Sequence, residues 1–448
     1  MPQAAQKRLP QPIFQEPFFS EDKPTPDPNG FMTKHPTDDA TYKKIESLLK
    51  KDTVPVPPSR FADDQLFGLS DAYGARGPAV LAAIEKAGKI IFHSCGDSGA
   101  SAVRKYADEL RVADQLTIDC AQANENNRAA FLYHLGDVVY NFGESRYYFD
   151  QFYEPFRAYP APILAIPGNH DSFIVPGTKK GSEPLTIFQR NFCATSPVIT
   201  PEAGSLHRTA MTQPGVYFAL DAPFVRIIGL FSNALEDPGV ISNESKNWPG
   251  LNKAQLPFLT AQLKLIKQQN YQGAVLLAVH HPPFSYAPQK GAAGAGGYHG
   301  CSTVMLREID TICQQEGVYP HAVLSAHAHN YQRYTRIVQF AGKEFDVPFI
   351  VCGDGGHNVN PLVQAKKGQP AVEPEIGSSV NWLDPKPVLK SKQLILEKYD
   401  QTNYGYLRIH VDKTQLRIGF HQVSGTSLAQ SRYDMVTVNL ADHTMVAN

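Results

Sequence analysis

The 448-residue sequence lacks any apolar run near the ~18–20 residues that a membrane-spanning helix requires, which excludes a spanning segment. It also lacks a charge excess, because 42 Lys and Arg stand against 43 Asp and Glu, and broad electrostatic binding to nucleic acid is therefore not expected. Apolar residues make up 42%, which is too many for a disordered chain. The sequence predicts a globular protein that binds neither nucleic acid nor membrane.

Cysteine is scarce as well, and the six copies lie far apart with no CxxC pair among them. This spacing argues against a thiolate zinc site and against a scaffold built from disulfides. Several of the cysteines occupy apolar, strand-like positions, where a free buried thiol is expected. The six are Cys95, Cys120, Cys193, Cys301, Cys313 and Cys352.

The first 60 residues carry 11 prolines, a density that disfavours both helix interiors and central strands. We expect an extended arm over residues 1–60, with one short helix near Thr41–Lys51, that packs on its own domain or joins subunits of a homo-oligomer. The stretch MPQAAQKRLPQPIF contains no continuous apolar segment of the signal-peptide kind, so the compartment stays open between cytoplasmic, periplasmic and secreted. Residues 61–448 are expected to form one large domain.

Short apolar runs follow from residue 89 onward, separated by stretches with helical spacing of apolar residues, such as 103–110 and 256–266. Runs of this length with little alternation are typical of strands buried on both faces. The strand–helix–strand order predicts an α/β fold. The runs are Lys89–Ser94, Phe131–Leu135, Ile163–Ile166, Phe224–Leu230, Gly273–Val279, His321–Ser325 and Pro348–Cys352.

The C-terminal segment has a different pattern. Tyr404–Val411 and Gln415–Gln422 alternate between apolar and polar residues around a short turn, and Met435–Leu440 resembles a further strand. No linker separates these strands from the preceding residues. We therefore expect an antiparallel addition to the same core.

Metal-capable side chains follow nearly every buried run, at the point where the strand should end. In open α/β sheets, ligands bind outside the carboxyl ends of the strands, where loops can aim side chains into one crevice. Oxygen and imidazole donors without thiolate suit Fe, Mn or Zn, and their number favours two ions bridged by a carboxylate. The segments are Gly96–Gly99, Gly136–Tyr140, Gly168–Asp171, His280–Pro283 and Ala326–Asn330.

Each of these segments has a simpler interpretation when it is taken alone. A lone Gly-Asp after a strand is usually a turn, an isolated His-x-His is more often two hydrogen-bonded buried histidines, and Asn169–Asp171 fits an Asx turn. Five such coincidences at strand ends, in an order that assembles one site, are improbable. The sequence therefore predicts a metal site.

Together the five segments resemble the motifs of the calcineurin-like metallophosphoesterases, and among these the purple acid phosphatase branch. The resemblance covers roughly Ile90–Asn358. Two details favour that branch: Asp97–Gly99 reads Asp-Ser-Gly where most of the superfamily has Asp-x-His, and Tyr140 follows Asp137 at the spacing of the branch's ligand tyrosine.

The resemblance implies a four-layer α/β/β/α sandwich that holds Fe(III) and a second divalent metal (Fe, Zn or Mn), bridged by Asp137. A phenolate ligand suits ferric iron, and the net positive charge left on such a pair matches a phosphate dianion. One position departs from the family pattern, because Ala326 replaces a glycine, and Gly353–His357 is interpreted as a strand-end loop outside the site. The implied ligands are Asp97, Asp137, Tyr140 and His329 for Fe(III), and Asp137, Asn169, His280 and His327 for the second ion.

The resemblance further implies hydrolysis of a small phosphate monoester, with a metal-bound hydroxide attacking phosphorus. His170 is expected near the incoming phosphate, where it would orient the phosphate or protonate the leaving oxygen. His281 either joins the catalytic groups or points into the core, and His299 is a second candidate for contact with substrate. The glycine-rich stretch Gly291–Gly300 forms either a lid over the metals or an ordinary solvent loop.

Two other functions stay open at this point. A phosphodiesterase of the same fold would use the same ions, because the choice of ester depends on the walls of the pocket. A metal-free interaction scaffold belongs to a different class, and the complete ligand set argues against it. Visible absorption separates a ferric tyrosinate enzyme from a colourless scaffold or di-zinc enzyme.

Overall fold

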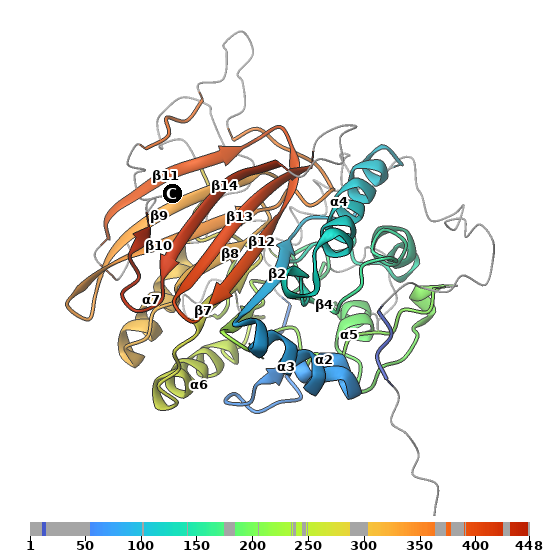
Figure 1. Ribbon diagram of the computed structural model, residues 1–448, viewed down its shortest axis with the longest axis horizontal. Helices are drawn as coiled ribbons and strands as arrows, with labels where there is room; N and C mark the ends of the chain where they lie inside the picture. Colours follow the sequence, from blue (N-terminus) through green and yellow to red (C-terminus); the bar gives the residue numbers. More distant parts are fainter. Residues whose placement is uncertain are drawn as a thin grey trace, which may run out of the picture.

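The computed structural model describes most of the chain beyond the N-terminal arm (Figure 1). Most of the proline-rich arm, its expected helix near Thr41–Lys51, the stretch Gly291–Gly300 and His299 lie outside the described residues. The described residues are 11–14, 54–100, 103–140, 142–173, 184–204, 206–233, 235, 239–243, 248, 250–286, 303–362, 373–377, 389, 391–423 and 431–446.

Within the described residues, one sheet has eight strands in the order β1-β5-β6-β7-β8-β10-β9-β11. Its centre is parallel, because β6, β7, β8 and β10 pair in that direction, whereas β9 pairs antiparallel with both β10 and β11. The strands are β1 (Phe67–Gly68), β5 (Phe218–Ala222), β6 (Val225–Leu230), β7 (Ala274–Val279), β8 (Ala322–Ser325), β9 (Tyr331–Phe340), β10 (Lys343–Cys352) and β11 (Ser391–Asp400).

The second sheet has seven strands over the described residues, in the order β15-β14-β13-β12-β2-β3-β4. Strands β2, β3 and β4 are parallel, and β12 joins them by antiparallel pairing with β2. The expected antiparallel C-terminal addition to the core is therefore confirmed. The strands are β2 (Lys89–Cys95), β3 (Leu132–His134), β4 (Ile163–Ala165), β12 (Tyr404–Asp412), β13 (Gln415–Val423), β14 (Ser431–Asn439) and β15 (Met445–Val446).

The two sheets face each other and carry helices on their outer faces (Figure 1). Strand β10 contacts β12 across the interface, and the ring of Tyr331 stacks on that of Phe420 with centroids 4.0 Å apart. Helix α3 packs on β2 and α4 on β12, whereas α6 contacts β6 and α7. The predicted four-layer α/β/β/α sandwich is confirmed.

Helix α3 begins and ends at recognisable signals. Helix α3 has proline in its first turn and ends at Gly88, whose left-handed backbone (φ 69°) allows its N–H to donate to the Glu85 carbonyl. The α-helices are α2 (Leu69–Tyr73), α3 (Gly77–Ala87), α4 (Val103–Gln122), α5 (Thr186–Phe192), α6 (Gln255–Gln268) and α7 (Thr303–Glu316). Short 3₁₀ turns are η2 (Gly74–Arg76), η3 (Glu125–Asn127), η4 (Ser145–Tyr147) and η6 (Pro201–Ala203), and η5 (Phe149–Tyr153) is a π turn.

The apolar runs all coincide with strands, but the sequence patterns did not reveal β9. Its sequence, YQRYTRIVQF, contains two arginines and two glutamines, yet most of its residues are buried. Arg336 lies there in a fully buried ion pair with Asp310. Because a paired arginine can occupy a buried position, the polar residues of this strand do not mark an exposed face, and its sequence lacks the polar–apolar alternation typical of a strand. None of the helices that the structure describes is long and apolar enough to cross a bilayer.

Candidate metal centre

The five motif segments meet at one edge of the sandwich, at the carboxyl ends of strands from both sheets. Strands β2, β3 and β4 of the seven-stranded sheet and β7 and β8 of the eight-stranded sheet lead into them. Loops at this edge can turn their side chains toward one point. The structure thus brings together seven of the predicted residues: Asp97, Asp137, Tyr140, Asn169, His280, His327 and His329.

Three of these residues have left-handed backbone conformations: Asp97 (φ 54°), Asp137 (φ 55°) and His327 (φ 64°). Such a conformation costs a non-glycine residue about 1 kcal/mol or more, and it persists only where the surrounding structure holds it in place. It turns the chain sharply at the strand end and directs the side chain back over the sheet edge. Strain concentrated on three neighbouring donors is typical of a functional site.

Two glycines let these loops approach each other. A Cβ atom on Gly168 would lie 2.1 Å from the Asp137 Oδ1 atom, so a side chain is excluded there. A Cβ on Gly96 would lie 2.4 Å from the Cβ of Ala326. The absence of a side chain at Gly96 therefore makes room for the methyl group of Ala326, the residue that departs from the family pattern.

The first group of donors surrounds the hydroxyl of Tyr140. This oxygen lies 2.9 Å from Asp97 Oδ1, 3.0 Å from Asp137 Oδ2 and 3.3 Å from His329 Nε2. A phenol has a single proton and can donate it to only one of the two carboxylates at a time. Burial and the charges of Asp137 and Asp97 raise the pKa of Tyr140 well above its ordinary value, because both disfavour a further negative charge at this point.

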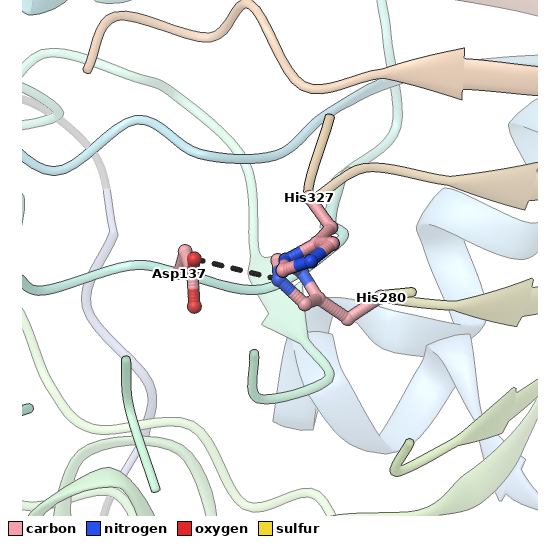
Figure 2. Close-up of side chains that lie close together, drawn as sticks. All are labelled: Asp137, His280 and His327. Carbon is pink, nitrogen blue, oxygen red and sulfur yellow. Dashed lines mark ion pairs between the residues drawn. The ribbon is translucent and has the colours of Figure 1, made fainter. Parts of the chain in front are cut away.

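The second group of donors surrounds the side-chain oxygen of Asn169. This Oδ1 atom lies 2.9 Å from His280 Nε2 and 3.1 Å from His327 Nδ1, and His280 Nε2 lies 3.4 Å from Asp137 Oδ2. Figure 2 shows the two imidazole rings side by side, with the Asp137 carboxylate facing them. The oxygen of Asp137 thus belongs to both groups.

The tautomer of His280 shows why this arrangement suits a cation. Its Nδ1–H donates to the Leu135 carbonyl at 2.9 Å, so in the neutral ring the Nε2 lone pair points at the oxygens of Asn169 and Asp137. Acceptor then faces acceptor, and only a proton or a metal ion can relieve the repulsion. Burial lowers the pKa of His280, but the charge of Asp137 outweighs burial and raises it to about 9.

The donor set passes a simple test of fit for metal. One ligand atom each from Asp137, His280 and His327 lies within 4.8 Å of the others, and all three residues are buried. The second ring nitrogen of His280 is fixed by a backbone carbonyl, as is usual for metal-ligating histidines. Carboxylate, phenol, amide and imidazole donors suit Fe, Mn or Zn.

The three histidines proposed for catalysis differ in where the structure places them. His170 lies at the site and is 7% exposed. The centroid of its ring is 4.2 Å from that of Tyr140, and its backbone N–H donates to Asp137 Oδ1. His281 is fully buried behind His327, with ring centroids 4.3 Å apart, and its nitrogens contact Ser232 and the Leu235 carbonyl. This is the core-facing one of the two orientations expected for His281. His299 is outside the described residues.

Sequence reasoning missed two residues at the site. The carboxylate of Asp171 accepts hydrogen bonds from the N–H groups of Val138, Val139 and Gly168, and so joins the loops after β3 and β4. His357, which was interpreted as lying outside the site, stacks on the ring of Tyr140. Its position in a glycine-rich turn after a buried strand, like the five recognised segments, was the signal that could have found it.

The match to a protein family agrees with the family resemblance. The sequence profile of a family described as calcineurin-like phosphoesterase matches residues 92–331, more than half of the chain. No curated protein matches. Among solved structures, the chain is similar to GAP50, described as the anchor in the inner membrane complex of Plasmodium, at 11% identity and a TM-score of 0.45, over 77% of this chain and 88% of that one. It is also similar to PhoD, at 12% identity and a TM-score of 0.46, over 80% of this chain and 71% of that one.

Proposed function

Because this chain belongs to the calcineurin-like phosphoesterases, a family of metal-dependent phosphoester hydrolases, we propose that it hydrolyses phosphate monoesters at a pair of metal ions. The observation that carries the proposal is the position of Asp137 Oδ2. This atom lies 3.0 Å from the hydroxyl of Tyr140 and 3.4 Å from Nε2 of His280, so a single oxygen serves both donor groups. A shared carboxylate between two donor groups is the arrangement that a bridged metal pair requires.

The two groups differ in charge, and this difference supports a different ion for each group. The group around Tyr140 contains a phenol and two carboxylates, which are hard anionic donors that favour Fe(III) once the phenol is ionised. The group around Asn169 contributes neutral amide and imidazole donors and suits a divalent ion (Fe, Zn or Mn). The proposed ligands are Asp97, Asp137, Tyr140 and His329 for Fe(III), and Asp137, Asn169, His280 and His327 for the divalent ion.

Bound metal ions supply positive charge to a phosphoryl group and lower the pKa of water. The protein's own residues hold the substrate at that point. The backbone N–H of His170 donates to Asp137 Oδ1 and its ring packs against that of Tyr140, so its imidazole is proposed to contact the phosphate. A protonated His170 would donate to the leaving oxygen.

The proposal is tested on protein loaded with iron alone and with iron plus zinc or manganese. We expect two bound metal ions per chain, a visible tyrosinate-to-ferric band, and faster turnover of monoesters than of diesters across pH 4–8. The substitution Tyr140→Phe should remove the band. Its matched control is Tyr148→Phe, which changes a fully buried tyrosine outside both donor groups and should keep the band.

Three outcomes would overturn parts of this function. Faster turnover of diesters would replace the monoesterase with a phosphodiesterase of the same fold. A colourless protein with two zinc ions would remove the ferric assignment but retain a metallophosphoesterase. Absence of bound metal under every loading condition would leave a non-catalytic scaffold.

A further inference from the structure

The ring of Tyr140 carries an unexpected neighbour, His357 from the loop that follows β10. The two rings are stacked, with centroids 3.5 Å apart and planes at 16°. The N–H of His357 donates to the Asp97 carbonyl at 2.9 Å, so the same loop also contacts the backbone of a second proposed ligand. The His357 ring further lies 5.2 Å from that of His329. His357 therefore touches three of the four residues proposed to hold Fe(III).

Both nitrogens of the His357 ring are engaged, which fixes its tautomer. Nδ1–H donates to the Gly99 carbonyl at 2.6 Å, and Nε2 therefore accepts from the ammonium group of Lys105 at 3.0 Å. Because Nε2 faces the ammonium group of Lys105, which can only donate, this nitrogen carries no proton and the ring is neutral. A neutral ring that accepts from a lysine cannot rotate without losing a charge-assisted hydrogen bond.

Lys105 lies near the start of α4 and is only 4% exposed, and a lysine is almost never buried to this degree unless it is paired, as Lys105 is with His357. Its neighbour one helical turn further on, Glu109, is also buried and accepts from the N–H of Ala100. Burial raises the pKa of Glu109 well above its ordinary value and so favours its neutral form. Lys105 therefore adds a positive charge on the side of the cluster where Tyr140 and His357 lie.

We propose that His357 and Lys105 are positioning residues for Tyr140: His357 fixes the plane of the phenol ring, and Lys105 places a positive charge next to the tyrosine-bearing donor group. This inference rests on the proposed function only where the measurement needs bound Fe(III), that is, for the charge-transfer band and the reduction potential. A positive charge near that group disfavours bound cations and favours a lower oxidation state of iron. It also stabilises the filled orbitals of a phenolate, which moves the charge-transfer band to shorter wavelength.

The test uses the full chain and four variants: Lys105→Met, Lys105→Arg, His357→Phe and His357→Ala. In metal-free protein titrated with Zn²⁺, Lys105→Met should bind at least about tenfold more tightly, because the repulsion between the lysine charge and the doubly charged ion is removed. In iron-loaded protein, the same variant should show a band at longer wavelength and a lower reduction potential. Lys105→Arg, which keeps the charge, should restore the wild-type affinity, band and potential.

The histidine variants test the ring itself. His357→Ala should weaken the near-ultraviolet circular dichroism that arises from an ordered Tyr140, in metal-free and loaded protein alike, and should broaden the ferric band. His357→Phe retains an aromatic ring for stacking and should restore the dichroism. Because His357→Ala leaves space in the core, unfolding curves accompany every spectrum, and the Zn²⁺ affinity of Lys105→Met still tests the proposal if the alanine variant does not fold.

The outcomes separate this inference from the proposed function. If wild-type protein binds Zn²⁺ but gives no ferric band, the ferric assignment fails, while a tighter Zn²⁺ affinity in Lys105→Met still supports the role of Lys105. Unchanged Zn²⁺ affinity in Lys105→Met overturns that role. Unchanged tyrosine dichroism in folded His357→Ala overturns the role of His357.

Discussion

Strand β8 joins two very different polar environments at its two ends. At its start, His321 accepts from the Val275 N–H at 2.9 Å, donates to the Leu440 carbonyl at 3.1 Å and stacks on His443 at 4.1 Å. At its other end the chain turns through the strained backbone of His327, whose Nδ1 faces the oxygen of Asn169. Both histidines are buried, so burial alone does not distinguish a structural histidine from a ligand.

The same contrast holds for charges. Toward the end of the sheet where His321 lies, Arg336 pairs with both oxygens of Asp310, at 2.8 and 2.7 Å, and also contacts the hydroxyl of Tyr319, and all of these groups are buried. Each donor there meets an acceptor, and the positive charge meets a negative one. At the opposite edge, Asp97 and Asp137 share one phenol proton.

The difference shows what marks a site in this fold. Buried polar groups that satisfy one another stabilise a structure that needs nothing further. Buried acceptors that face other acceptors, on backbone held in a strained conformation, are stable only with an added cation or proton. The comparison predicts that substitutions at the two ends will fail in different ways.

The largest effect is expected for Asp137→Asn. Loss of the shared carboxylate should release both proposed ions and lower the proposed phosphomonoesterase activity by about 10⁴-fold, the order observed when a catalytic centre is dismantled. Metal analysis and steady-state kinetics measure both quantities. Asp310→Asn is the matched control, because it changes an equally buried aspartate and should retain the ions; a metal-replete Asp137→Asn protein would refute the bridging role.

Next is Arg336→Met at the satisfied cluster. It leaves the buried carboxylate of Asp310 without its cation and should destabilise the fold by about 3–5 kcal/mol. Denaturant unfolding gives the free energy, and metal content per folded molecule should match the wild type. If Arg336→Met lost metal but kept the wild-type free energy of unfolding, this cluster would serve metal binding rather than stability, and the proposed contrast between the two ends of β8 would be wrong.

A smaller effect is expected for Asp171→Asn. An amide can accept fewer of the three backbone hydrogen bonds and also introduces donors beside the N–H groups of Val138 and Gly168. Cation affinity should fall by about 10–100-fold, the usual effect of a residue that orients a ligand loop. Calorimetric titration with Zn²⁺ measures this affinity, and wild-type affinity would show that the loops hold their shape without the carboxylate.

The smallest effect concerns pH and the stacked histidines. Burial lowers the pKa of His321, and it lowers that of His443 to about 2, so the folded protein keeps both rings neutral while the unfolded chain protonates them. The contribution of these two rings to the free energy of unfolding is complete above pH ~6.5 and is lost as the pH falls below that value. Between pH 7.5 and 5, the free energy of unfolding of His321→Gln should therefore fall by about 1 kcal/mol less than that of the wild type. Urea unfolding at the two pH values measures this difference. An equal pH dependence of the unfolding free energy in both proteins would contradict the prediction.

Much of the fold and of the site could be predicted because the relevant signals are local. Each proposed ligand lies within a few residues of the end of an apolar run, so Asp97, Asn169 and His280 could be placed at one edge from sequence alone. The family resemblance, which the profile match confirms, fixed the layer order. The ligand roles themselves stay predictions.

The remaining parts depend on contacts that no local pattern records. His357 reaches Tyr140 only because β10 lies beside β8 in the assembled sheet. The role of Lys105 depends on how α4 packs, since a lysine in the first turns of a helix normally extends into solvent. Strand β9 was missed because its charges are neutralised by partners on other elements.

The origin of the donors in separate sheets has a mechanical consequence. Asp97, Asp137 and Asn169 extend from one sheet, whereas His280 and His327 extend from the other. Coordinated ions would therefore cross-link the two layers at this edge, much as a disulfide closes a loop, but reversibly. A chelator would then do more than stop turnover: it would let the layers separate at this edge first, and amide exchange should accelerate there before it does elsewhere.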